Sequence, residues 1–372
     1  MSKICYFSSS RADYGIAKIL CKTLEKIYKK NFFILATGSH LSKKNGYTIN
    51  EIRKDKFKNL KILKFPIFNN TAKDIAFNSV VLMKKISIFF EKNKLKYIIL
   101  LGDRYEVFIC AYVANLFNIK IIHIIGGDST FGSKDDIYRH SISLMSQFSI
   151  VTNIISQIKL ISLGIKKKTI FNLGNLNLEN YKKKFLSKKD LQNKYKIKFN
   201  KINFLITFHP ETENKNITES YLKNCINIFR SIKNASFIFT SSNFDMGGNN
   251  INQIINKYVK KNSNIAYFIK SFGREAYFSL LQNIDLVIGN SSSAICEVPS
   301  FKIGSLNIGK RQDGRIFAKS VINSDGSEKD IRKKIKYMLS KNFKNKIKKQ
   351  NNVYFKKNPL NKYISVLKKI IK

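Results

Sequence analysis

The chain has 372 residues, a formal net charge of +44 and a hydrophobic fraction of 44%. That fraction supplies buried cores and excludes wholesale disorder, and the length exceeds that of a typical single domain, so we expect two domains. Lysine provides most of the positive charge and is spread through almost every predicted helix, without a helix-turn-helix, zinc-finger or RNP-like pattern beside it. We therefore expect no dedicated nucleic-acid partner.

Cysteine and histidine usage points to a reduced protein without a metal. The five cysteines are scattered and odd in number, which argues against a disulfide framework or a cysteine-based zinc site. The four histidines show no ligand spacing, and neither GxGxxG nor GxxxxGK[ST] occurs. The N-terminus turns polar too early for a signal peptide, and no apolar run approaches the roughly 18 residues of a transmembrane helix. We expect a cytoplasmic protein with no cofactor, metal or membrane contact.

In the first half of the chain, apolar runs alternate with segments of helical periodicity. The expected strands are 3–9, 32–38, 97–103, 119–128 and 148–153, and the expected helices are 16–30, 74–93 and 106–118. This alternation predicts a parallel sheet covered by helices on both faces. The pattern breaks over 160–200, and we place the link between two domains near residue 172.

A second alternating series follows the break. The expected strands are 202–210, 236–242, 265–272, 285–293 and 303–309, and the expected helices are 219–233, 251–261, 276–283 and 296–301. Two successive halves of this kind predict an α/β fold with two Rossmann-like domains in a glycosyltransferase-B arrangement. The first domain would cover 1–172 and the second 173–349.

Polar clusters end two neighbouring strands of the first half. Asp103 and Arg104 close one apolar run, and Asp128 closes the next after two glycines. Because ligands bind at the carboxyl ends of strands in open α/β sheets, these positions predict an active-site rim. Asp135 and Asp136 follow on a loop, where they can also be read as a charge pair at the start of a helix. For a single cluster, ordinary turn residues are the alternative.

The second half carries two further polar strand ends. Gly289 and Asn290 end one strand and are followed by Ser291, Ser292 and Ser293, a combination of hydroxyls and a helix start that favours an anion. The alternative is a simple serine N-cap. His209 ends another strand, where a structural hydrogen bond is the alternative to a functional role.

These motifs resemble, in the same order, those of the hydrolysing branch of the UDP-N-acetylglucosamine 2-epimerases, enzymes of the sialic- and legionaminic-acid pathways. The matching segments are SSSRADYG (8–15), LGDRYEVFICAYVA (101–114), IIHIIGGDSTFGSKDDIYRHSISLMS (121–146), TFHPET (207–212) and IGNSSSAICEVPSFKIGSLNIGKRQDGR (288–315). One position departs from the family, which usually has glutamate where this chain has Asp128. Its side chain is one methylene shorter.

The resemblance implies roles for individual residues. Asp103, Asp128, Asp135 and His209 would be catalytic, the first two as the proton-transfer pair. The residues that would contact the UDP-sugar are Arg11, Arg104, Asn243, Phe272, Ser291, Ser292, Glu297, Arg311 and Arg315. Among these, the serines would hold the diphosphate and Glu297 the ribose hydroxyls. A final helix at about 350–372 would return to the first domain, and the protein would be a homo-oligomer, a dimer or tetramer.

The implied activity is hydrolytic epimerisation of UDP-N-acetylglucosamine or of its 2,4-diacetamido-2,4,6-trideoxy analogue. The products would be UDP and a free 2-acetamido mannose-type sugar, formed through a glycal intermediate for nonulosonic acid biosynthesis. The alternatives are a non-hydrolysing 2-epimerase, a transferase of the same fold and a catalytically inactive sugar-nucleotide sensor. The strong positive field would help to gather an anionic nucleotide-sugar.

Overall fold

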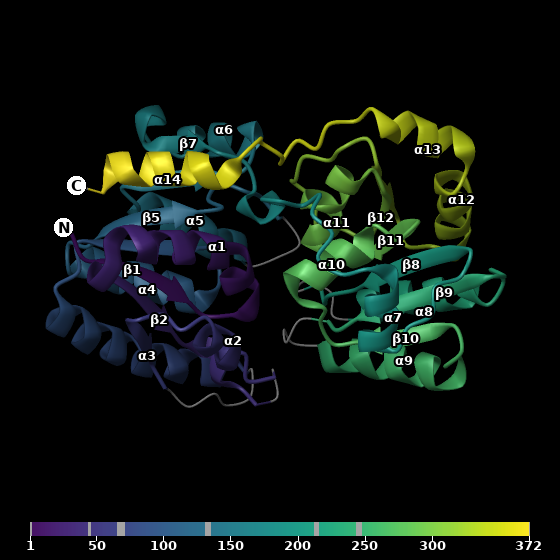
Figure 1. The fold of residues 1–372 in the computed structure, drawn as a ribbon, viewed down its shortest axis with the longest axis horizontal. Helices are drawn as coiled ribbons and strands as arrows, with labels where there is room; N and C mark the ends of the chain where they lie inside the picture. The colour runs from purple at the N-terminus through teal and green to yellow at the C-terminus, as the bar shows by residue number, and fades with distance from the viewer. Residues whose placement is uncertain are drawn as a thin grey trace. The chain divides into compact units, whose positions relative to one another are not determined.

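The chain forms two compact α/β units (Figure 1). The structure is a computed structural model that describes residues 2–43, 46–64, 71–130, 135–211, 216–242 and 248–371. Unit 1 comprises residues 1–129, 134–179 and 356–372, and unit 2 comprises residues 130–133 and 180–355.

Unit 1 is built on a parallel sheet with the strand order β3-β2-β1-β4-β5-β6-β7 among the described residues. Its strands are β1 (Ile4–Ser8), β2 (Phe32–Ala36), β3 (Leu60–Ile62), β4 (Tyr97–Leu101), β5 (Lys120–Ile124), β6 (Phe148–Val151) and β7 (Ile170–Asn172). Side chains alternate between two cores: Tyr6 of β1 faces one, whereas Cys5 and Phe7 face the other. Burial on both faces explains why these strands are continuous apolar runs.

Helices cover both faces of this sheet. The helices of unit 1 are α1 (Arg11–Tyr28), α2 (Ile49–Lys54), α3 (Ala72–Asn93), α4 (Tyr105–Leu116), α5 (Asp135–Met145), α6 (Ile154–Ser162) and α14 (Pro359–Ile370). Helices α1 and α14 share one core, and α3, α4 and α5 share the other. The hydroxyl of Tyr363 on α14 donates to the Gly174 carbonyl at 3.0 Å, which ties the end of the chain to unit 1.

Unit 2 repeats the plan with the strand order β10-β9-β8-β11-β12-β13, all parallel. Its strands are β8 (Ile202–Thr207), β9 (Ala235–Thr240), β10 (Ala266–Ile269), β11 (Leu286–Gly289), β12 (Gly304–Ile308) and β13 (Val321–Ser324). Its helices are α7 (Lys188–Tyr195), α8 (Ile217–Phe229), α9 (Gly248–Lys261), α10 (Gly273–Leu281), α11 (Ser292–Cys296), α12 (Glu328–Met338) and α13 (Lys341–Lys348). Strand β1 lies inside the sheet of unit 1 and β8 inside the sheet of unit 2, so the strand order reverses beside each of them, as in Rossmann-like folds.

Several element boundaries differ from those predicted. The first helix begins at Arg11, five residues early, because Ser10 caps it and Asp13 completes a capping box. The segment near residue 172, where we placed the interdomain link, is the edge strand β7, and the change of unit follows Glu179. The last helix starts only at Pro359, in the first turn, where proline is tolerated because its missing N–H would be unpaired anyway. Asn358 before it is the N-cap and has a left-handed conformation.

Short edge strands escaped the sequence analysis. Strands β3, β7 and β13 have three or four residues each, which is too few to show a periodicity. In the described part of the chain, no helix has both the length and the apolarity needed to cross a membrane.

Candidate active site

Arg139 connects the two strand ends of unit 1 that carry Asp103 and Asp128. It is only 3% exposed and ion-pairs with Asp103, which follows β4, and with Asp136 at 2.5 Å. Its guanidinium also donates to the backbone carbonyl of Asp128, which follows β5, at 2.7 Å. Because β4 and β5 are neighbours in the sheet, one buried cation fixes both strand ends. Arg139 was absent from the predicted site residues.

The Asp128 carboxylate lies in a cradle of hydrogen-bond donors. Its Oδ1 accepts from Ser156 Oγ at 2.5 Å, from Asn153 Nδ2 at 3.3 Å and from Thr152 Oγ1 at 3.4 Å. These donors follow β6, and Asn153 is the N-cap of α6, so the carboxylate lies at the positive end of a helix dipole. Gly127 makes the close approach possible, because a Cβ there would overlap the Ser156 carbonyl.

Asp135 is the first residue of α5, not a loop residue as predicted, and it is partly buried. Asp136 beside it makes the i, i+3 ion pair with Arg139. The two acids therefore occupy the first turn of a helix, where negative charge is stabilised. Asp136 therefore has the structural role of an acid at a helix start. The catalytic role of Asp135 remains a prediction.

His123 positions the loop that carries Asp103. Its side chain is fully buried, with Nε2 2.8 Å from the Gly102 carbonyl and Nδ1 2.8 Å from Ser143 Oγ. Burial lowers the pKa of this imidazole to about 4, so it is neutral at pH 7 and donates from Nε2. A single histidine inside an apolar run gives no sequence signal for such a role.

The motif 8–15 is largely structural. The Asp13 carboxylate, 5% exposed, accepts hydrogen bonds from the backbone N–H groups of Ser9 and Ser10 and from all three preceding serine hydroxyls. Arg11, predicted to contact the UDP-sugar, opens α1 and ion-pairs with the partly exposed Glu51 at 2.9 Å. Arg104, another predicted substrate contact, ion-pairs with the buried Glu106 at 3.1 Å at the start of α4.

In unit 2, Asn290 joins three loops at the carboxyl ends of the strands. Its side chain accepts from the His209 backbone N–H at 2.7 Å and donates to the His209 carbonyl at 2.8 Å. Its own carbonyl accepts from Arg311 at 3.2 Å and from Gln312 at 2.8 Å. Asn290 has no exposed surface. The structure thereby brings the predicted residues His209 and Arg311 to one place. Asn290 and Gln312, which connect these loops, were not among the predicted site residues.

The serine loop adjoins this hub. Gly289 has a φ of +134° and lies so close to the Thr207 carbonyl that a Cβ would collide with it, which explains the glycine. Ser291 stands at the N-cap of α11 without a side-chain capping bond, and Ser292 is the first helical residue. The N-cap reading therefore fits the position of Ser291 but not its side chain, which makes no capping bond.

Glu297 and its neighbours form the far side of the loop. Ser293 Oγ lies 2.6 Å from both Glu297 Oε2 and the Tyr277 hydroxyl. Arg315 donates to Cys296 Sγ at 3.1 Å. The predicted pair Glu297 and Arg315 thus flanks the same short helix.

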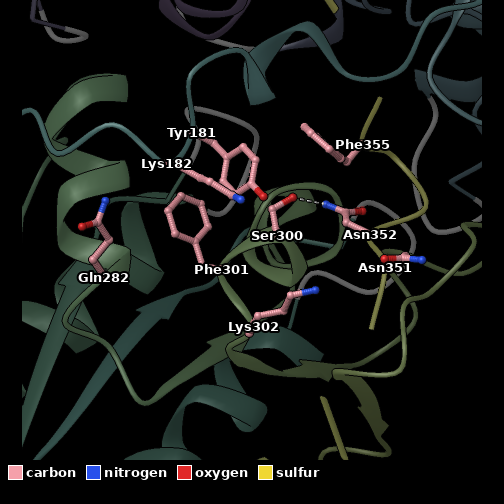
Figure 2. A pocket seen from close by; sticks show the side chains of 9 residues that line it. All are labelled: Tyr181, Lys182, Gln282, Ser300, Phe301, Lys302, Asn351, Asn352 and Phe355. Carbon is pink, nitrogen blue, oxygen red and sulfur yellow. Dashed lines mark hydrogen bonds between the residues drawn. The ribbon is translucent and has the colours of Figure 1, made fainter. Parts of the chain in front are cut away.

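Two predicted substrate contacts remain, Phe272 and Asn243. The ring of Phe272 is 7% exposed and packs on Tyr195 with centroids 4.6 Å apart, just before α10. Asn243 lies outside the described residues. A cavity in unit 2, lined by Tyr181, Phe301 and Phe355 among others, lies away from the strand-end loops because its residues Gln282 and Lys302 precede β11 and β12 (Figure 2).

We expect the free energy of unfolding to fall as the pH drops below about 6.5. Burial lowers the pKa of His40 and His123 from 6.5 to about 4, and burial together with Arg311 lowers the pKa of His209 well below 6.5. In that window the unfolded chain binds protons that the native protein does not, at a cost of about 1.4 kcal/mol per pH unit for each group. Urea unfolding at roughly pH 7, 6 and 5 measures the slope. His123→Gln should flatten it, and a stability that rises on acidification would contradict the assignment.

Two parallel sheets, each covered by helices and with polar residues gathered at its strand ends, place the chain in the class of Rossmann-like α/β proteins. The family model described as "UDP-N-acetylglucosamine 2-epimerase" matches residues 22–368, and the chain belongs to this family. The resemblance inferred from the motifs is thereby confirmed.

Individual relatives agree with this assignment. The chain is 37% identical over 343 residues to the "GDP/UDP-N,N'-diacetylbacillosamine 2-epimerase (hydrolyzing)" of Campylobacter jejuni, covering 92% of this chain and 88% of the relative. It is 33% identical over 374 residues to the "Polysialic acid biosynthesis protein P7" of Escherichia coli, covering 100% and 95%. The solved UDP-GlcNAc 2-epimerase of Neisseria meningitidis bound to UDP-GlcNAc has a TM-score of 0.81 at 16% identity, covering 99% and 100%. The predicted fold class, two Rossmann-like units of the glycosyltransferase-B type, is confirmed.

Proposed function

We propose that this protein is a hydrolysing 2-epimerase of a UDP-linked 2-acetamido sugar. It would release UDP and the free mannose-type sugar for nonulosonic acid biosynthesis. The observation that carries the proposal is the 37% identity over nearly the whole chain to a relative named as a hydrolysing 2-epimerase. Because that relative is named for N,N'-diacetylbacillosamine, the 2,4-diacetamido-2,4,6-trideoxy sugar is the first substrate to test. UDP-N-acetylglucosamine is the second, because another relative is named for polysialic acid biosynthesis.

The proposed reaction needs a base, an acid and cations for the leaving group. A carboxylate removes the proton from C2 while the C1–O bond breaks, and the electron pair of that bond leaves with UDP. Water then adds across the resulting C1–C2 double bond: the hydroxyl goes to C1, and a proton goes to C2 on the opposite face. The sugar is thereby inverted at C2 and released.

Asp103 and Asp128 are the proposed proton-transfer pair, with Asp135 assisting. Asp103 and Asp128 follow adjacent strands. Arg139 contacts the side chain of Asp103 and the backbone carbonyl of Asp128. The buried guanidinium ion-pairs with Asp103 and thereby fixes the orientation of its side chain, as proton abstraction requires. His209, Arg311 and Arg315 are the proposed partners of the departing diphosphate, and Glu297 is the proposed partner of the ribose.

A direct assay separates this function from its alternatives. The protein is incubated with each UDP-sugar, and with the GDP-linked form of the diacetamido sugar, in deuterated water, and the products are followed by NMR. A free inverted sugar with deuterium at C2 together with the nucleoside diphosphate supports the proposal. An epimerised but intact nucleotide-sugar identifies a non-hydrolysing enzyme, release that depends on an acceptor identifies a transferase, and binding without turnover identifies a sensor.

Replacing Ser291 and Ser292 together by alanine should weaken UDP binding about tenfold or more, because each lost hydrogen bond to a charged group costs roughly 1.5–3 kcal/mol. Isothermal titration calorimetry with UDP measures the change. Ser263→Ala, at an exposed position of the same unit, is the matched control and should bind normally. Wild-type affinity in the double variant would remove the serine loop from the site.

A further inference from the structure

Unit 2 contains a cavity of about 750 Å³ that the proposed function does not use (Figure 2). Ligand sites in proteins have volumes of roughly 300–1,000 Å³, so the cavity is large enough for a small organic molecule. Its residues Gln282 and Lys302 precede β11 and β12, whereas the serine loop follows β11. The cavity is therefore a candidate ligand site separate from the proposed active site.

Three aromatic side chains line the cavity, and we call them the aromatic wall. Tyr181 contacts Phe301 and Phe355 edge-on, with ring centroids 5.5 and 5.3 Å apart. Phe355 is 37% exposed, and in the described part of unit 2 only Tyr337 is another large hydrophobic residue with so much exposed surface. Because exposed rings gain free energy when another ring covers them, the aromatic wall favours a ligand that carries a flat ring.

The polar groups of the lining favour a negative charge on that ligand. Lys182 and Lys302 contribute ammonium groups, and none of the described residues that line the cavity is acidic. The Lys182 nitrogen lies 5.9 Å from the centre of the Tyr181 ring, so positive charge adjoins the aromatic wall. The Lys302 ammonium donates one of its three N–H groups to the Gln350 carbonyl, which holds it at the cavity. An anion with a flat ring matches both parts of the lining.

One short helical segment connects the cavity to the serine loop. The segment begins at Ser291, the N-cap of α11, and ends at Phe301, the last residue of the 3-10 helix that follows α11. Asn352, which is 7% exposed and also lines the cavity, donates to the Cys296 carbonyl at 2.8 Å and to Ser300 Oγ at 2.7 Å. A ligand in the cavity therefore contacts the same rigid segment that carries the serine loop.

We propose that this cavity binds a nucleoside monophosphate and that the bound nucleotide changes the affinity of the serine loop for UDP. The base would stack on the aromatic wall, and the phosphate would pair with the ammonium groups. The carboxamides of Gln282 and Asn351 would bond to the ribose hydroxyls. The site itself does not depend on the proposed function, whereas its coupling to UDP rests on that function.

Calorimetric titration of the full chain with AMP, without and with saturating UDP, tests the site. AMP should bind at least tenfold more tightly than adenosine or inorganic phosphate, because each of these lacks one of the two matching parts. UDP should not displace AMP. If AMP no longer binds once UDP saturates the protein, the two nucleotides share one site and the proposal is wrong.

Substitutions at the cavity decide whether AMP binds there. Lys182→Glu, at an exposed position, should weaken AMP binding at least tenfold, and Phe355→Ala should weaken it about fivefold or more. Lys183→Glu makes the same charge change at the next residue, whose ammonium lies over the Phe185 ring, and it should bind AMP normally. Tyr337→Ala, at a residue 41% exposed on α12, is the control for the lost ring. Far-UV circular dichroism checks that each variant is folded.

The same titrations measure the coupling between the two sites. AMP should change the Kd of UDP about fivefold or more, and UDP should change the Kd of AMP by the same factor, because linkage is reciprocal. Lys182→Glu should remove this effect but keep the UDP affinity measured without AMP. No measurable AMP binding, or AMP binding unchanged in both cavity variants, would overturn the site, and a UDP affinity that ignores AMP would overturn the coupling. A protein that binds AMP but hydrolyses neither UDP-sugar would contradict the proposed function and support the cavity site.

Discussion

Replacing either Asp103 or Asp128 by asparagine is expected to lower turnover by on the order of 100-fold or more. Asparagine keeps the volume and the hydrogen-bonding oxygen of the acid but removes the basic group. UDP affinity should change little, because the proposed contacts to the nucleotide belong to unit 2. Initial rates of UDP release and calorimetric UDP binding, measured on the same preparations, separate the two effects.

Two further variants sharpen this experiment. Glu328→Gln removes a surface carboxylate that pairs only with Arg332 among the described contacts, and it should leave turnover unchanged. Asp128→Glu restores the side chain usual in the family and should retain activity or raise it. The assignment of proton transfer to these residues is wrong if both asparagine variants turn over at near-normal rates, or if C2 keeps its original hydrogen in deuterated water.

Removing the charge of Arg139 is expected to damage both stability and turnover. Arg139→Leu leaves Asp103 and Asp136, each at most a quarter exposed, without their shared cation. Breaking a buried pair in this way costs about 3–5 kcal/mol, and the partial exposure of both acids reduces the loss here to about 2–3 kcal/mol. Turnover should fall as well, because Asp103 loses the contact that orients it.

Urea unfolding of a double-mutant cycle measures the interaction. The loss in Arg139→Leu should shrink when Asp136→Asn is added, because one of the two stranded charges is then gone. Arg139→Lys keeps the charge but not the fork that reaches three partners, so it should recover only part of the stability. A variant Arg139→Leu within about 0.5 kcal/mol of the wild type would show that the cluster contributes little.

Local sequence patterns were sufficient for the strands and helices that build the cores. Runs such as 97–101 and 121–124 are buried on both faces of a parallel sheet, so their largely apolar composition predicts them. The predicted ends of helices and strands were less accurate. The start of α1 depends on the capping box between Ser10 and Asp13, and the short edge strands depend on pairing with a neighbour that is distant in the sequence.

The carboxylates of the candidate site were foreseeable for a related reason. Asp103 and Asp128 each directly follow a strand or its short turn, and parallel strands end at the same edge of the sheet. Their residue types and spacing, together with the matching motifs, therefore pointed to one rim of unit 1 and to the family.

By itself, the sequence determined the fold class, the family and the strand ends where chemistry is proposed, because each of these depends on residues close together in the chain. Only the tertiary structure revealed which residues hold the others in place. Arg139 reaches Asp103 across 36 positions, and Asn290 reaches His209 across 81. Contacts of that range are created by the order of strands in the sheets, and no local pattern of residue types records that order.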